Sequence, residues 1–134
     1  MKELYRILQE ALQDAGYRVG NYGENNPPSE EINAILTMEE MNPIENGFAH
    51  YQASITIQLI NGTSWDEDFR KISEVLLSFI PMEDRYDGLK TLPDRSDKMI
   101  LLDIPVFSDI SIDIDEDTAE ETHGIAIELY LDFN

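Results

Sequence analysis

Hydrophobic residues recur every three to four positions over residues 3–15 of the chain. This spacing places them on one stripe and predicts a surface helix packed on a core, with polar residues on its other side. Gly16 follows at the position where a left-handed residue would end the helix. Residues 20–29 then combine Gly, Asn and Pro in a pattern typical of a loop. The apolar stripe consists of Leu4, Ile7, Leu8, Ala11, Leu12 and Ala15.

A period of two is clearest from His50 to Ile60, where apolar and polar residues alternate without a break. Strict alternation predicts a strand with one buried and one outward face. A shorter apolar run at residues 32–38 predicts a neighbouring, well-buried strand. Residues 39–47, which include Pro43, predict the connection between the two strands. The outward face of the longer strand carries His50, Gln52, Ser54, Thr56 and Gln58.

The second half of the chain begins with a more strongly apolar helical stripe. It predicts a helix that starts at Ser64 and continues until Pro81 stops it. Ser64 and Glu67 match a capping box at the start of this helix. Two alternating runs near the end, residues 109–115 and 125–133, predict a closing hairpin.

The connection between that helix and the hairpin, residues 81–103, is long, polar and rich in turn residues. Within it, only Met99 to Leu102 predicts a short strand. A connection of this length without regular structure of its own is unusual in a compact domain and is often functional.

The predicted elements follow the order α-β-β-α-β-β, so that each helix precedes a hairpin. This order predicts an α+β fold in which a four-stranded, mainly antiparallel sheet carries both helices on one face. The other face is expected to be polar and open. A chain of 134 residues fits one domain, residues 1–134, and is long enough to bury a core without cross-links.

The chain is strongly acidic, since 28 Asp and Glu against 9 Lys and Arg give a net charge of -19. Such a field repels phosphate backbones and anionic lipids, which argues against direct nucleic-acid binding and membrane adsorption. It also attracts basic partners. The lack of Cys excludes disulfides, thiolate metal sites and a cysteine nucleophile. The first residues do not predict a signal peptide, and no apolar run is long enough to predict a membrane span.

Candidate catalytic and metal-binding residues form no recognisable constellation in the sequence. His50 lies on the outward face of a strand and His123 lies beside Gly124 at a turn, so both are interpreted as exposed polar residues. The acidic run 113–117 resembles a calcium loop only superficially, because Thr118 occupies the position where such loops need Gly. We therefore predict no catalytic residues, no metal site and no cofactor, and we expect the protein not to be an enzyme.

Two surface features remain as candidate subunit contacts. The outward polar row of the long strand is uncharged in an acidic chain, and the cores of protein interfaces are depleted of charge. An ordinary solvated sheet face is the alternative interpretation. Residues 81–103 and their basic side chains are expected to meet an acidic surface on a neighbouring copy, as head-to-tail ring assembly requires. The predicted contact residues are Gln52, Ser54, Thr56, Gln58, Arg85, Lys90, Arg95 and Lys98.

Three features near the end of the chain complete the pattern: the stretch 103–109 (DIPVFSD), the acidic link after it, and the final strand 125–133. In these features and in the order of its elements, the chain resembles the tail terminator, or tail-completion, proteins of long-tailed bacteriophages. The likeness is architectural, covers nearly the whole chain and includes no signature motif. Related phage neck and connector proteins share the same elements.

The resemblance implies a non-enzymatic structural protein. Such a protein would form a homo-oligomeric ring, expected to be a hexamer, that caps the tail tube and joins it to head-connector proteins. The implied location is the virion tail, assembled in the cytoplasm of a bacterial host. A prophage is one implied source.

Two other classes of protein are small, acidic and α+β. Secretion chaperones and similar effector-binding proteins bind clients through an exposed sheet and helix. They usually finish on a helix, whereas this sequence finishes on a predicted strand. A DNA-mimicking inhibitor would explain the charge but not the neutral strand face. Both classes remain alternatives to the tail terminator.

Overall fold

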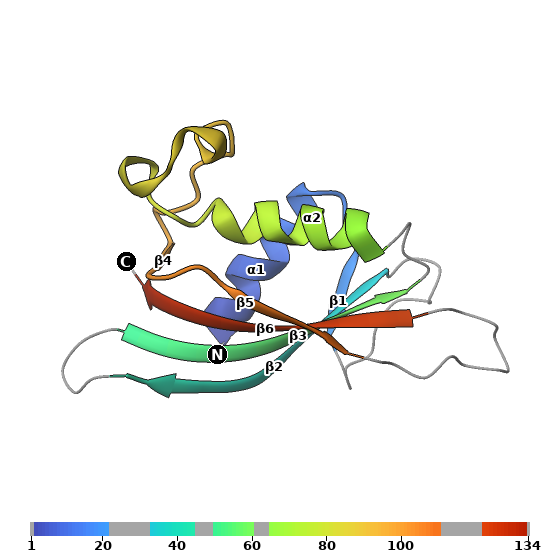
Figure 1. Cartoon of the computed structure of the whole chain (residues 1–134). Helices are drawn as coiled ribbons and strands as arrows, with labels where there is room; N and C mark the ends of the chain where they lie inside the picture. Colours follow the sequence, from blue (N-terminus) through green and yellow to red (C-terminus); the bar gives the residue numbers. More distant parts are fainter. Residues whose placement is uncertain (1, 22–32, 45–49, 61–64, 111–121, 134) are drawn as a thin grey trace, which may run out of the picture.

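The computed structural model describes residues 2–21, 33–44, 50–60, 65–110 and 122–133 (Figure 1). Its class is α+β, as predicted from the sequence. Neither of its two described α-helices is long and apolar enough to cross a membrane. In chain order, the elements are α1 (Lys2–Asp14), β1 (Val19–Asn21), β2 (Ala34–Pro43), β3 (His50–Ile60), α2 (Trp65–Leu77), η2 (Met82–Asp84), η3 (Asp87–Leu89), β4 (Met99–Leu101), β5 (Val106–Ile110) and β6 (Thr122–Phe133).

The sheet has six strands, so the predicted four-stranded sheet is wrong in this detail. The strand order is β1-β2-β3-β6-β4, and β5 also pairs with β6. β1 runs parallel to β2, and all other described pairs are antiparallel. β1 and β4 have only three residues each, which is too few for a visible alternation. β1 overlaps the start of the stretch 20–29, which was interpreted as a loop, whereas β4 matches the short strand expected at 99–102.

β3 and β6 form the centre of the sheet and pair along their length, with Ser54 opposite Glu128 near the middle. The strand predicted from His50 to Ile60 is confirmed as β3. β6 contains the predicted strand 125–133. The capping residue Ser64 and the acidic run 113–117 lie outside the described part of the chain, so those two interpretations stay predictions.

β2 differs most from its prediction. It begins at Ala34 and continues to Pro43, so the connection predicted over residues 39–47 is wrong for its first half. A bulge between Met38 and Glu40 shifts the register and breaks the alternation that would have revealed the strand. Pro43 is tolerated because β1 covers the outer side of β2 only as far as Leu36.

Both helices pack on the same face of the sheet, and the core lies between them and the strands (Figure 1). Phe69 of α2 also contacts Phe107 of β5, with ring centroids 4.9 Å apart. Each fully buried Leu or Ile contributes about 1.5–3 kcal/mol to folding. The sheet's part of this core consists of Ala34, Leu36, Ala53, Ile55, Ile57, Leu59, Met99, Leu101, Ile125, Ile127, Leu129 and Leu131.

The end of α1 is set by Gly16, as predicted. Gly16 has a φ of 100°, in the left-handed region. Its amide donates to the carbonyl of Gln13 (3.0 Å), and the amide of Tyr17 donates to that of Leu12 (3.0 Å). This pair of bonds is a Schellman motif, which satisfies helix carbonyls that would otherwise have no donor. The motif turns the chain so that Tyr17 enters the core.

The connection after α2 is organised around one buried side chain, Arg85, which is 4% exposed. A cation at the C-terminal end of a helix is stabilised by the helix dipole and by the last carbonyls. Segments 78–80 and 89–93 are thereby held together by one guanidinium group. Arg85 donates hydrogen bonds to the backbone oxygens of Ser78 (2.7 Å), Ile80 (2.8 Å), Leu89 (3.4 Å), Leu92 (2.8 Å) and Pro93 (2.9 Å).

Candidate interaction surfaces

The side of the sheet opposite the helices carries the uncharged row predicted from the sequence. Gln52, Ser54, Thr56 and Gln58 alternate along β3 with buried core residues, and all four are partly exposed. The structure therefore brings these four predicted contact residues together on one surface. We call this surface, formed by the outward side chains of β2, β3, β5 and β6, the open face. Its contact with another subunit stays a prediction.

The register extends the row of small side chains across four strands. Thr56 of β3 lies opposite Thr37 of β2 and Ala126 of β6, and Ala126 lies opposite Ser108 of β5. All four side chains are small and uncharged, so the middle of the open face is hollowed. The result is a groove of about 310 Å³, whose lining also includes Glu39, Val106 and Glu128.

The carboxylate of Glu128 on the open face accepts hydrogen bonds from two neighbouring side chains. Its Oε1 accepts a hydrogen bond from Nε2 of Gln52 (2.9 Å) and a longer one from the hydroxyl of Tyr130 (3.4 Å). The amide of Gln52 also lies 3.3 Å from Oγ of Ser54. Sequence reasoning missed Glu128 because its place beside Gln52 and Ser54 depends on the pairing of β3 with β6.

Charge is distributed unequally between the two sides of the molecule. All nine Lys and Arg lie in residues that the structure describes, and none is in a strand. The strands contain acidic residues, of which Glu40, Glu128 and Asp132 are placed on the open face by their register with Ser54 and His50. The outward row of β3 is therefore uncharged from Gln52 to Gln58, and Glu40 and Glu128 lie beside it on the two neighbouring strands.

The basic residues after α2 form ion pairs or hydrogen bonds within their own chain. Arg85 is buried, and a buried side chain cannot contact a neighbouring copy, so we remove it from the predicted contact set. The other three are at the surface but each lies within 4.0 Å of an acidic group of the same chain. These pairs are Lys90 with Asp87 (3.2 Å), Arg95 with Asp14 (3.7 Å) and Lys98 with Glu10 (3.1 Å).

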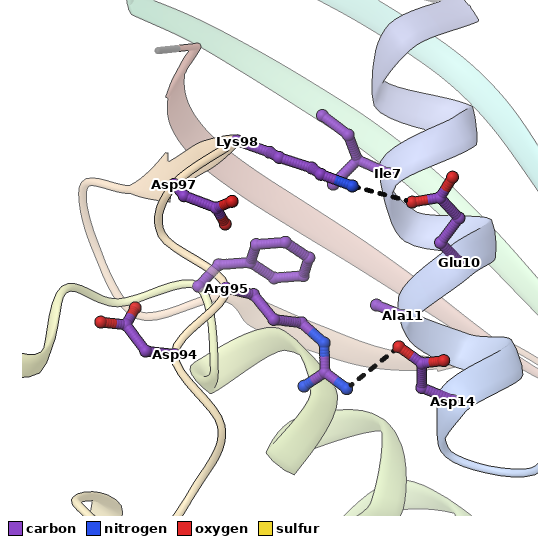
Figure 2. A pocket seen from close by; sticks show the side chains of 9 residues that line it. Ile7, Glu10, Ala11, Asp14, Asp94, Arg95, Asp97 and Lys98 are labelled. Atoms are coloured by element: carbon purple, nitrogen blue, oxygen red, sulfur yellow. Dashed lines mark hydrogen bonds and ion pairs between the residues drawn. The ribbon is translucent and has the colours of Figure 1, made fainter.

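Two of these pairs bridge a cleft of about 190 Å³ between α1 and residues 94–98 (Figure 2). Arg95 and Lys98 extend across it toward Asp14 and Glu10 of α1 (Figure 2). Hydrogen bonds from the hydroxyl and the amide of Ser96 hold the pKa of Asp94 below its usual value. Arg95 and Lys98 therefore fasten this segment to α1, which the sequence alone did not indicate.

An exposed apolar surface lies at the junction of β4 and β5. Leu102 is 44% exposed, Ile104 68% and Val106 53%. Leu101 at the end of β4 pairs with Leu131 of β6, and Val106 at the start of β5 pairs with Glu128 of β6. Four residues, 102–105, therefore lie opposite only two residues of β6, and the chain bulges outward here. We call Leu102, Ile104 and Val106 the apolar edge. The run Ile104-Pro105-Val106 was a signal for it, but sequence reasoning used that run only for the resemblance.

The interpretation of His123 as an exposed residue at a turn is wrong. His123 lies in β6, and its Nε2 is 3.6 Å from Oδ2 of Asp68 in α2. Asp68 is 2% exposed, and its Oδ1 accepts a hydrogen bond from the hydroxyl of Tyr17 (3.0 Å). Burial, followed by the bond from Tyr17 to Asp68, raises the pKa of Tyr17. His50 lies on the open face as predicted, 3.8 Å from Asp132.

Within the described ranges, no three His, Cys, Asp or Glu side chains are grouped so that they could hold a metal ion. Comparison with known proteins found no family model and no curated protein that matches the chain. In the part of the chain that the structure describes, the fold is α+β and both helices lie on one face of the sheet, away from the open face. Functional proposals for this chain rest on that surface chemistry.

Proposed function

We propose that this protein is a non-enzymatic structural subunit that works by docking onto other protein subunits. Its resemblance to phage tail terminators gives the proposal its specific form: a ring of copies that caps a tail tube and joins it to the head. The observation that carries the proposal is the uncharged row Gln52, Ser54, Thr56 and Gln58 along the central strand β3 of the open face, in a chain of net charge -19.

The chemistry of the open face supports a contact role. Interface cores are depleted of charge, and a typical interface forms about ten direct hydrogen bonds across the contact. Gln52, Ser54, Thr56 and Gln58 provide hydrogen-bonding groups on one strand, and Glu40 and Glu128 lie beside them on the neighbouring strands. A solvated surface that needed only to keep an acidic protein soluble would have no reason to exclude charge from the whole outward row of β3.

The apolar edge supports association between copies. Ile104 is 68% exposed and has exposed apolar neighbours at Leu102 and Val106. Grouped exposed apolar side chains are typical of protein contact sites. An edge strand such as β5 also presents unpaired backbone groups to a neighbour. The ring proposed here would cover this edge.

The polar cluster of Tyr17, Asp68 and His123 supports a structural rather than a catalytic assignment. Tyr17 is 8% and Asp68 is 2% exposed, so both groups are enclosed by the two helices and the sheet. A reacting group must reach its substrate. The cluster is better placed to join α1, α2 and β6 than to act on a ligand.

Electron microscopy tests the proposal directly. Tail tubes assembled from the tube protein of a long-tailed phage would be incubated with the purified protein. The expected result is a ring at one end of each tube, and the matched control is a tube incubated with Ile104→Asp protein. Unchanged tube ends, together with co-purification of one basic client, would support the chaperone class instead.

A further inference from the structure

The groove on the open face combines a small floor with a fixed negative charge. Its floor is formed by Thr56, Ala126 and Ser108, and Val106 provides an apolar wall. Glu128 also lines this groove and provides the negative charge. A volume of about 310 Å³ is at the lower end for ligand pockets and is suited to one side chain rather than to a large molecule.

The carboxylate of Glu128 is held in position before any partner arrives. Both of its hydrogen bonds, from Gln52 and from Tyr130, are made to Oε1. Its second oxygen, Oε2, accepts no bond from the residues described here, and Glu128 remains partly exposed. A carboxylate fixed in this way loses little side-chain freedom on binding a cation, which strengthens the contact.

The charge around the groove selects a basic partner. Glu39 also lines it, and no Lys or Arg lies in any of the described strands. The open face of a second copy is a poor occupant, because Glu39 and Glu128 of the two copies would then face each other. Six of the nine basic residues also have an acidic partner in their own chain. These are Arg70, Lys71, Arg85, Lys90, Arg95 and Lys98.

We propose that this groove receives an arginine side chain presented by a basic protein other than this chain. The aliphatic stem of the arginine packs on Ala126 and Val106, and its guanidinium binds Glu128. Arginine fits better than lysine because its planar fork pairs with a carboxylate through two parallel hydrogen bonds and is less strongly hydrated. This proposal rests on the proposed function only because it treats the open face as a contact surface. It goes further by naming the side chain that the partner presents.

The test is a titration of a fluorescent hexa-arginine peptide, followed by anisotropy, at about 150 mM salt, where long-range attraction is screened beyond about 8 Å. Glu128→Gln removes the charge and keeps the shape, whereas Ala126→Leu fills the groove and keeps the charge. Glu83→Gln is the matched control, since Glu83 is an exposed acid in η2, on the other side of the molecule. Thermal unfolding of each variant checks that it is folded.

We expect Glu128→Gln and Ala126→Leu each to weaken peptide binding about fivefold, and Glu83→Gln to weaken it less than about 1.5-fold. We also expect hexa-lysine to bind more weakly than hexa-arginine. Equal losses of peptide affinity for Glu128→Gln and Glu83→Gln would overturn the proposal. They would show that the peptide responds to the net charge of the protein rather than to the groove.

A change in the sedimentation of the protein alone caused by Ala126→Leu would also overturn it, because the groove would then lie between copies. The titration is independent of ring formation. Peptide binding that depends on Glu128 in a chain that never assembles would contradict the proposed ring and leave the groove proposal intact.

Discussion

The phenol of Tyr17 donates a hydrogen bond of 3.0 Å to the buried carboxylate of Asp68, across 51 positions of the sequence. Tyr17 follows the end of α1, Asp68 lies in the first turn of α2, and His123 of β6 lies 3.6 Å from the other oxygen of Asp68. A carboxylate near the start of a helix is also favoured by the helix dipole. This contact therefore joins both helices to the central pair of strands.

Replacing Tyr17 by Phe should destabilise the fold at neutral pH. The change keeps the ring but leaves Oδ1 of Asp68 buried without its donor, which costs about 1–3 kcal/mol in the free energy of unfolding. Chemical denaturation measures this difference. Tyr86→Phe is the matched control, because Tyr86 is 68% exposed and its loss of a hydroxyl should change stability by less than about 0.5 kcal/mol.

The same tyrosine predicts a pH dependence at alkaline pH. The pKa of Tyr17 is raised in the folded protein, chiefly by burial and then by its bond to Asp68. Its stabilising contribution is therefore fully present below the unfolded pKa of about 10 and is lost as the pH rises toward the folded value. Above about pH 10, the free energy of unfolding of the wild type should fall more steeply than that of Tyr17→Phe. Parallel slopes for the two proteins would contradict this assignment.

Arg85 should be the most sensitive position in the segment after α2. Arg85→Ala leaves the backbone oxygens of Ser78, Ile80 and Pro93, among others, without their buried donor, so we expect a loss of about 3 kcal/mol or more. Arg85→Lys should also destabilise, because one ammonium group cannot reach oxygens on several sides.

Lys90→Ala is the control in the same segment. Its partner, Asp87, has a fully exposed side chain, so breaking this ion pair should leave the stability of the fold almost unchanged. Equal melting temperatures for Arg85→Ala and Lys90→Ala would refute the role assigned to Arg85.

The apolar edge should control association between copies. Ile104→Asp places a charge on a side chain that is 68% exposed, so the monomer should keep its stability while self-association weakens at least tenfold. Tyr86→Asp makes a matched change at a site with the same exposed fraction, on the segment after α2. Light scattering over a concentration series compares the two. An equal effect of both substitutions would mean that added charge, rather than the edge, opposes association.

Long, regular patterns were sufficient to predict much of the fold. The alternation in His50–Ile60 and the stripe in residues 3–15 each follow one period, and the elements they predict are present with small shifts at their ends. β2 was cut short because a bulge at Met38 and Glu40 shifts the alternation by one residue. β1 has three residues, which is too short for any periodic signal.

The surfaces were less predictable because they depend on pairing between distant segments. The outward row of β3 could be read from one strand, but the groove requires Ala126 and Ser108 to lie beside Thr56. The four basic residues after α2 looked like a free patch in the sequence. Only the fold shows that Arg85 is buried and that Lys98 reaches Glu10, 88 positions away.

The central claim is that this chain acts by assembling with other protein subunits. Sedimentation velocity over a concentration series, with and without a phage tail-tube protein, is the most direct test. We expect a closed assembly larger than a dimer, either at high concentration or on the tube protein. A chain that remains a monomer or a stable dimer at every concentration, and does not bind the tube protein, would contradict it.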